Sequence, residues 1–224
     1  MRKFGIVLAA LACLSLMAIP AMAAKGDMTF GLGGGVVVPT GDFGEKFKLG
    51  YGGGVFGDYM VTEQFAVGAD IGFCQNKIKA AHWQKWIDGY NAAATDKASV
   101  EETSTIMPFG VHGKWLPPMQ DSKFTPFVQL GVGFYRVQDK AEVTAADATI
   151  ARAWDLVSFD ETENKIGING GAGVDYAVSP AFKVGIFATM HDIMTKGKAT
   201  QLFSAGVNLT FSTAGFTTGG GAKK

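Results

Sequence analysis

Eight segments of this chain alternate between apolar residues and small or polar residues with a period of two. In the clearest of them, residues 65–75, one face carries Phe65, Val67, Ala69, Ile71 and Phe73, and the other carries Ala66, Gly68, Asp70, Gly72 and Cys74. A period of two is the geometry of a β-strand whose two faces meet different surroundings. The pattern therefore predicts eight strands, over residues 28–39, 50–61, 65–75, 106–116, 125–137, 165–178, 182–191 and 201–211.

The connections between these segments alternate in length. Short ones fall at residues 62–64, 117–123 and 179–181, and longer ones at 40–49, 76–103, 140–164 and 193–199. Short turns at one end and longer loops at the other are typical of up-and-down barrels that cross the bacterial outer membrane, with the turns in the periplasm and the loops outside the cell.

Alternation alone fits a soluble barrel as well, so the outward face has to be identified. The non-apolar face is mostly glycine, which makes a weak solvated exterior but leaves room inside a narrow barrel. No stretch after the N-terminus reaches the roughly 18 apolar residues of a spanning helix. The apolar face carries aromatic rings beside the short turns, as expected at a membrane interface: Phe30, Tyr59, Phe65, Trp115, Tyr176, Phe182 and Phe211. The prediction is an all-β, eight-stranded antiparallel transmembrane β-barrel.

The N-terminus has the three parts of a secretory signal peptide. Arg2 and Lys3 are followed by an apolar stretch over residues 4–19 and by Ala21-Met22-Ala23, a small-x-small cleavage site. A helical membrane anchor is the alternative. We expect a cleaved signal peptide over residues 1–23, a barrel over 24–211, a flexible tail over 212–224, and a location in the outer membrane. Cys74 is then the one cysteine of the mature chain, so no internal disulfide is expected.

Several short motifs resemble the outer-membrane β-barrel group that includes OmpX, OmpW and the OmpA membrane domain. They are Pro39-Thr40-Gly41-Asp42-Phe43, Gly50-Tyr51-Gly52-Gly53-Gly54, and Phe124-Thr125-Pro126-Phe127 leading into Gly131-Val132-Gly133. The last strand, residues 204–211, is similar to the family's assembly signal at Gly206, Leu209 and Phe211. The resemblance implies insertion by the barrel assembly machinery and contact with outer-membrane lipid and lipopolysaccharide. The family usually ends on the terminal aromatic, whereas this chain continues to Lys224.

Chemical motifs are weak. Residues 52–57 match G-x-G-x-x-G, but a dinucleotide site needs a helix after the motif, and here an alternating strand continues. His112 and His191 lack a second ligand at metal spacing and a nucleophile partner. With 20 basic and 20 acidic residues there is no basic footprint for nucleic acid. We expect no enzymatic activity, cofactor, metal or nucleic-acid partner.

A polar cluster is predicted inside the barrel. By strand parity its members are Asp58, Asp70, His112, Lys114, Asp175, Lys183 and His191. Asp175 and Lys183 flank a short turn and are expected to face each other on paired strands. The cluster is interpreted as a plug that stabilises the fold, with a charged pore constriction as the alternative.

The 76–103 loop contains an aromatic stripe at helical spacing, formed by Trp83, Trp86, Ile87 and Tyr90. A helix here would lie on the membrane, cap the barrel, bind a ligand, or pack against neighbouring loops, with Trp154 as its partner. The function predicted is a structural or surface-interaction role in the outer membrane, through a loop ligand that is not identified. The alternative is a passive, porin-like conduit for small apolar compounds.

Overall fold

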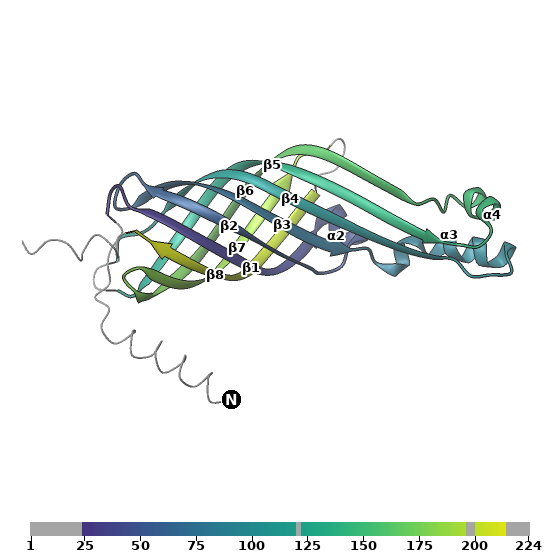
Figure 1. Cartoon of the computed structure of the whole chain (residues 1–224), viewed down its shortest axis with the longest axis horizontal. Helices are drawn as coiled ribbons and strands as arrows, with labels where there is room; N and C mark the ends of the chain where they lie inside the picture. The colour runs from purple at the N-terminus through teal and green to yellow at the C-terminus, as the bar shows by residue number, and fades with distance from the viewer. Residues whose placement is uncertain (1–23, 120–121, 196–199, 214–224) are drawn as a thin grey trace, which may run out of the picture.

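A computed structural model describes residues 24–119, 122–195 and 200–213. The predicted signal peptide (1–23) and nearly all of the predicted tail (214–224) lie outside the described residues. Eight antiparallel strands close into an up-and-down barrel, in which each strand pairs with its sequence neighbours and β1 pairs with β8 (Figure 1). The strands are β1 (Met28–Thr40), β2 (Gly50–Met60), β3 (Phe65–Lys77), β4 (Ser99–Trp115), β5 (Phe124–Thr144), β6 (Phe159–Ser179), β7 (Phe182–Ile193) and β8 (Thr200–Ser212).

The alternating pattern places apolar side chains outside and small or polar ones inside. Ile71, Val184 and Val207 are exposed or half-buried on the outer surface, while Asn208 is buried in the lumen. Closure occurs along Phe30–Phe211 and the pairs that follow in β1 and β8. Each predicted strand is present, and residues 52–57 lie inside β2 with no helix after them.

Three strands are much longer than predicted. β4 begins at Ser99, β5 continues to Thr144 and β6 begins at Phe159, so parts of the expected 76–103 and 140–164 loops are sheet. The alternation signal is missing there because both faces carry polar residues, as in Glu101-Glu102-Thr103-Ser104-Thr105. A strand beyond the apolar band has water rather than lipid on its outer face, so its pattern no longer alternates.

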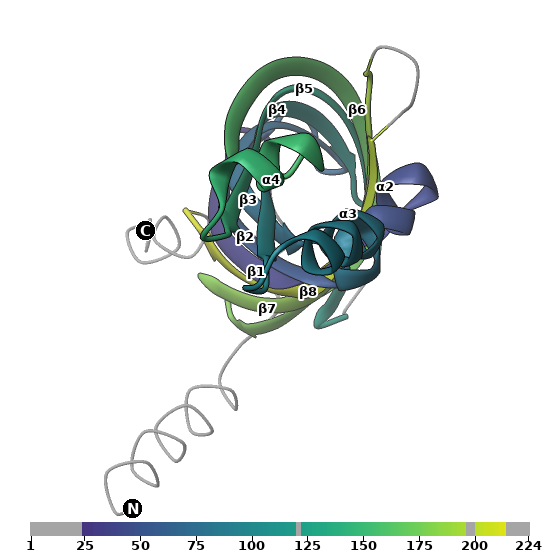
Figure 2. The same cartoon turned by 90° about the vertical axis from the view of Figure 1, so that its right-hand side faces the viewer.

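The long strands carry two helices at their far end, α3 (Ala80–Ala93) and α4 (Ala148–Ala153) (Figures 1 and 2). A third helix, α2 (Gly41–Lys46), lies beside β1 and β8 at the same end of the barrel and was not predicted. We call residues 78–103 and 138–164 the head. Short turns close the opposite end, so the barrel has one blunt end and one projecting end.

Candidate functional site

A cluster of four ionisable side chains from three neighbouring strands lies in the lumen near the short turns. His112 of β4 contacts Asp58 of β2 through Nε2 (2.7 Å) and Asp70 of β3 through Nδ1 (3.0 Å). Lys114 binds the second carboxylate oxygen of Asp58. Asp58 and His112 meet because the residue between them on β3 is Gly68, where a Cβ would overlap both side chains. We call Asp58, Asp70, His112 and Lys114 the lumen ion cluster.

A second polar contact also forms across an intervening strand, over a glycine. Asp175 on β6 and Asn208 on β8 both pair with Gly185 of β7, and Asn208 donates a hydrogen bond of 2.8 Å to Asp175 over that glycine. The expectation that Asp175 faces Lys183 is wrong, because Lys183 pairs with Ala177. The turn is centred on Pro180 rather than Ser179, with a register shift between Ala177 and Ser179, and this moves the partner by two positions.

Aromatic rings fill the lumen around the charges. The Lys114 ammonium lies 4.7 Å from the Phe56 ring centre and 5.1 Å from that of Phe127. Each ring occupies the space opposite a glycine, Gly31 for Phe56 and Gly173 for Phe127, where a Cβ would overlap it. Beyond them lies a cavity of about 160 Å³, bordered among others by His112, Phe187 and His191.

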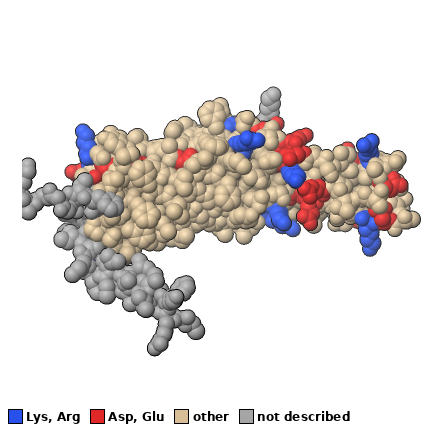
Figure 3. Space-filling view, viewed as in Figure 1, with Lys and Arg blue, Asp and Glu red and all other residues tan. Residues whose placement is uncertain are grey.

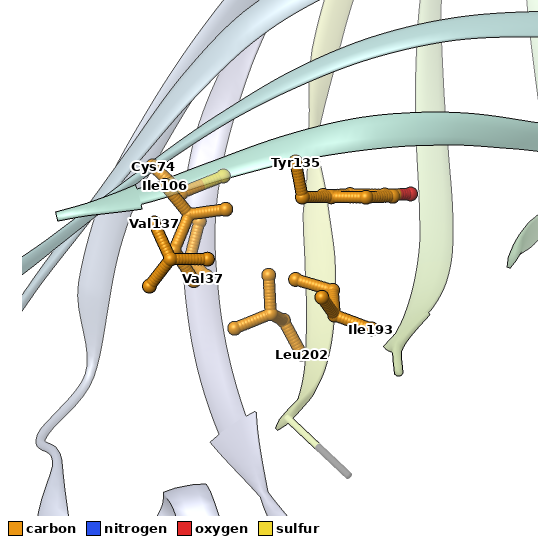
Figure 4. Close-up of a cluster of buried hydrophobic side chains, with 7 residues drawn as sticks. All are labelled: Val37, Cys74, Ile106, Tyr135, Val137, Ile193 and Leu202. Atoms are coloured by element: carbon orange, nitrogen blue, oxygen red, sulfur yellow. The ribbon is translucent and has the colours of Figure 1, made fainter. Parts of the chain in front are cut away.

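The cavity is bounded on the head side by a small polar contact and an apolar cluster. Tyr135 contacts His191 Nδ1 through its hydroxyl (3.1 Å) and accepts a hydrogen bond from Asn169 (3.5 Å). Seven buried side chains from β1, β3, β4, β5, β7 and β8 then point toward one another across the barrel (Figure 4). This outer apolar cluster consists of Val37, Cys74, Ile106, Tyr135, Val137, Ile193 and Leu202, with Phe43 of α2 packed against it.

The head has its own core. Tyr90, Ala98, Ala151 and Leu156 are buried together, and the aromatic stripe of α3 packs against them. The Trp154 ring lies over Gly89, as the sequence suggested for this partner. Among the four roles considered for the aromatic helix, the contacts of α3 are those of local packing.

Hydrogen bonds tie the two halves of the head together. The Tyr90 hydroxyl donates to Asp96 (2.7 Å) and accepts from the Asp147 N–H (3.0 Å), while Asp96 also accepts from the Ala146 N–H (2.8 Å). The hydrogen bond from Tyr90, followed by that from Ala146, lowers the pKa of Asp96. Asp147 caps α4 by accepting from the N–H groups of Thr149 and Ile150.

Charge is distributed unevenly along the molecule. On the face drawn in Figure 3, the barrel wall has few charged residues, and most Lys, Arg, Asp and Glu lie on the projecting part, with a smaller group at the blunt end. The head contains eleven acidic and five basic residues, a net charge of −6 with His82 neutral, in a chain whose net charge is zero. The head is therefore anionic.

The aromatic residues predicted for a girdle lie beside the short turns. Phe30, Tyr59, Phe65 and Trp115 are exposed, and Phe211 stacks on Phe182 with ring centres 5.0 Å apart. The Tyr176 ring packs against that of Phe124, with ring centres 5.2 Å apart; Phe124 is an exposed ring at the same level that was not predicted for the girdle. Phe124 is the first residue of β5, directly after a short turn, and this position could have indicated its place in the girdle. Gly206, Leu209 and Phe211 all lie in β8, where the barrel closes.

Comparison with known proteins now identifies the family. The model of the outer membrane protein beta-barrel domain matches residues 9–211. The chain belongs to this family. No curated protein sequence matches it. Among solved structures, OprG of Pseudomonas aeruginosa has 15% identity and a TM-score of 0.51, covering 86% of this chain and 99% of that one. Ail of Yersinia pestis, in complex with the heparin analogue sucrose octasulfate, has 10% identity and a TM-score of 0.50, covering 84% and 99%.

The chain is thus a small outer-membrane β-barrel protein, and its exposed apolar band faces lipid. Within the described ranges, no helix has both the length and the apolar content to cross a membrane. In the same part of the chain, no three His, Cys, Asp or Glu side chains form a ready-made metal site.

Proposed function

We propose that this protein is a non-enzymatic, non-conducting outer-membrane barrel whose anionic head binds a positively charged partner at the cell surface. The observation that carries the proposal is the head itself. Strands of 21 residues in β5 and β6, against 13 in β1 and β8, extend the sheet beyond the lipid-facing band. The head is then ordered by a separate core rather than by the barrel.

Two features of the lumen support a barrel that does not conduct ions. The lumen ion cluster and the Phe56 and Phe127 rings fill the end near the short turns, and the outer apolar cluster fills the other. Eight strands leave an interior just wide enough for side chains. The cluster is therefore interpreted as a plug, in preference to a charged constriction.

The sign of the head's charge defines the partner's chemistry. Ail is described in complex with a heparin analogue, which is a polyanion. A head with a net charge of −6 repels polyanions and attracts cationic proteins or peptides, with an interaction that weakens as salt screens it. A basic protein surface fits this head better than a sulfated glycan does.

The remaining roles follow the family and the lumen chemistry. Both ring nitrogens of His112 are engaged by carboxylates, which supports a structural role over that of a catalytic base. Outer-membrane lipid and lipopolysaccharide are the expected surroundings of the apolar wall. The barrel assembly machinery is the expected insertion partner, with Gly206, Leu209 and Phe211 as the assembly signal.

Binding of the intact protein to charged surfaces tests the proposal. Vesicles holding the folded protein are passed over immobilised polyarginine and over heparin at low and physiological salt. We expect salt-sensitive retention on polyarginine and none on heparin. A variant with Asp160→Asn, Glu161→Gln and Glu163→Gln should lose retention, whereas Asp27→Asn, at the blunt end, should not. Retention on heparin, or equal retention of both variants on polyarginine, would overturn the proposal.

One observation favours a second function, passive transfer of a small apolar compound. The cavity of about 160 Å³ is bordered by Phe56, Phe127 and Phe187 and has room for a small solute. Planar-bilayer conductance and liposome uptake separate the two functions. A silent bilayer together with uptake of an apolar solute would favour the conduit, and a large, stable conductance would contradict both.

A further inference from the structure

A row of polar side chains separates the outer apolar cluster from the core of the head. Ser104 of β4 pairs with Asp139 of β5, which pairs in turn with Glu161 of β6. These residues have the same strand parity as the lumen residues, so they face the concave side of the sheet. Glu102, two residues before Ser104, lies on the same face and is buried.

Several oxygens in this row have no hydrogen-bond partner among the described residues. Ser104 is 0% exposed and its Oγ is unpartnered, as is the buried Oδ1 of Asp139. The row continues through Asn76 of β3, which is 1% exposed. The Asn76 amide donates to the Val37 and Lys48 carbonyls (3.3 and 2.9 Å), which fixes its orientation and leaves Oδ1 unpartnered. Buried oxygens in native structures normally have a partner, so the unpartnered oxygens of Ser104 and Asp139, which lie on paired positions, indicate a missing one.

The row also carries more negative than positive charge. Asp139 and Glu161 are directly opposite, an arrangement of like charges that destabilises paired strands. Glu102 accepts one hydrogen bond, from the Trp83 indole (2.8 Å). Asp139 repels Glu102 electrostatically, and His82 and Lys46 compensate the charge of Glu102 only in part. The nearby lysines of the same sheet are engaged elsewhere, Lys140 with Glu142 and Lys165 with Glu163.

We propose that this row binds a calcium ion through the carboxylates of Asp139 and Glu102 and the hydroxyl of Ser104. Carboxylate, hydroxyl and amide oxygens are the ligands of hard cations, and Ca²⁺ tolerates irregular geometry with water completing its shell. Paired strands lie about 4.8 Å apart, a spacing that lets one ion bridge facing side chains whose oxygens do not bond each other. Glu161, exposed at the edge of the row, provides the entry side.

The composition of the site sets its expected affinity. The site offers two carboxylates and one hydroxyl, and no third carboxylate is already in place. A high-affinity calcium-binding loop provides more protein ligands than this. We expect a dissociation constant of about 0.1–1 mM, the range of extracellular calcium modules. The ion would join β4 to β5 and, through Glu102 and Trp83, hold α3 against the sheet.

Terbium luminescence tests the site directly, because Trp83 contacts a proposed ligand. The full-length protein folded in lipid vesicles is titrated with Tb³⁺ under indole excitation, and Ca²⁺ is added as competitor. We expect a saturable signal that Ca²⁺ displaces. Asp139→Asn should weaken Tb³⁺ binding at least tenfold and Ser104→Ala several-fold. Glu142→Gln removes the same charge from the outer face of β5 and should leave binding unchanged.

The outcomes are separable from those for the proposed function, because cation binding needs no protein partner. A parent protein without a saturable, Ca²⁺-displaced signal would overturn the site and leave ordered water as the partner of these oxygens. Equal loss in Asp139→Asn and Glu142→Gln would overturn it as well, since it would show diffuse attraction by surface charge. If Asp139→Asn does not give a heat-modifiable folded band, Ser104→Ala, which changes no charge, decides the question.

Discussion

Replacing Asp58 by asparagine is the sharpest test of the lumen ion cluster. The Asp58 carboxylate is 4% exposed, contacts His112 Nε2 at 2.7 Å, and accepts from Lys114 and from Thr29 Oγ1 at 3.4 Å. Asparagine keeps the shape but leaves the buried Lys114 ammonium without a counter-charge. Removing one partner of a buried pair costs about 3–5 kcal/mol. The Phe56 and Phe127 rings still face the ammonium, and cation–π attraction of about 0.5–2 kcal/mol keeps the loss near the lower limit.

The double variant Asp58→Asn with Lys114→Met is the matched control. It removes both charges of the Asp58–Lys114 pair, so the Lys114 ammonium is no longer buried without Asp58, and we expect it to lose less stability than Asp58→Asn alone. Urea unfolding in phospholipid vesicles, followed by the heat-modifiable band on gels, measures both. The stabilising role of the cluster would be refuted if Asp58→Asn and the parent unfolded at the same midpoint urea concentration. It would also be refuted if the double variant were less stable than the single variant.

Three further predictions concern orientation, assembly and pH. Ile71→Arg should lose about 2–4 kcal/mol of folding stability in bilayers, because Ile71 faces lipid in mid-wall; an Ile71→Arg variant that folds into bilayers as well as the parent would contradict this orientation. Phe211→Ala should lower the heat-modifiable folded fraction, because β8 must pair with β1 to close the barrel, whereas deletion of residues 217–224 should change little; the reverse result would move the signal into the tail. The lowered pKa of Asp96 stabilises the head at pH values above the ordinary carboxyl pKa of about 3.9, and this contribution is lost as pH falls through the lower, folded-state value. Three of the four tryptophans lie in the head, so their fluorescence should report this transition in the parent and not in Asp96→Asn.

The lipid-facing part of the fold was predictable because lipid imposes a rule on every second residue. Positions such as Val67, Ile71 and Val184 face lipid and must be apolar. The residues next to them in the strand face the lumen and can be glycine or polar. Parity alone therefore placed Asp58, Asp70, His112 and Lys114 inside. It did not give their contacts, because His112 meets Asp58 across the intervening strand β3, and that meeting depends on Gly68.

Register errors have the same origin. The turn at Pro180 sets which residues of β6 and β7 face each other, and a shift of one residue in its centre exchanged Lys183 for Gly185 as the partner of Asp175. The alternation within one strand shows which side chains point into the barrel. Which residue of the next strand each of them faces depends on the turn and on how the barrel closes, and the alternation gives no information about either.

The extension of β4, β5 and β6 into the head was not predicted, for a physical reason that also bears on the function of the head. Above the lipid, Glu101 and Glu102 lie on opposite faces of β4, so both faces carry polar residues and the two-residue period vanishes while the strand continues. The extended parts of β4, β5 and β6 are stabilised by their pairing with one another and by the core of the head around Tyr90. Because this part lies outside the lipid, its outward side chains need not be apolar, and its acidic side chains are available to bind a partner at the cell surface. The carboxylates of the row at its base repel each other, and this is the reason to test Asp139 for calcium binding before searching for a protein partner further out.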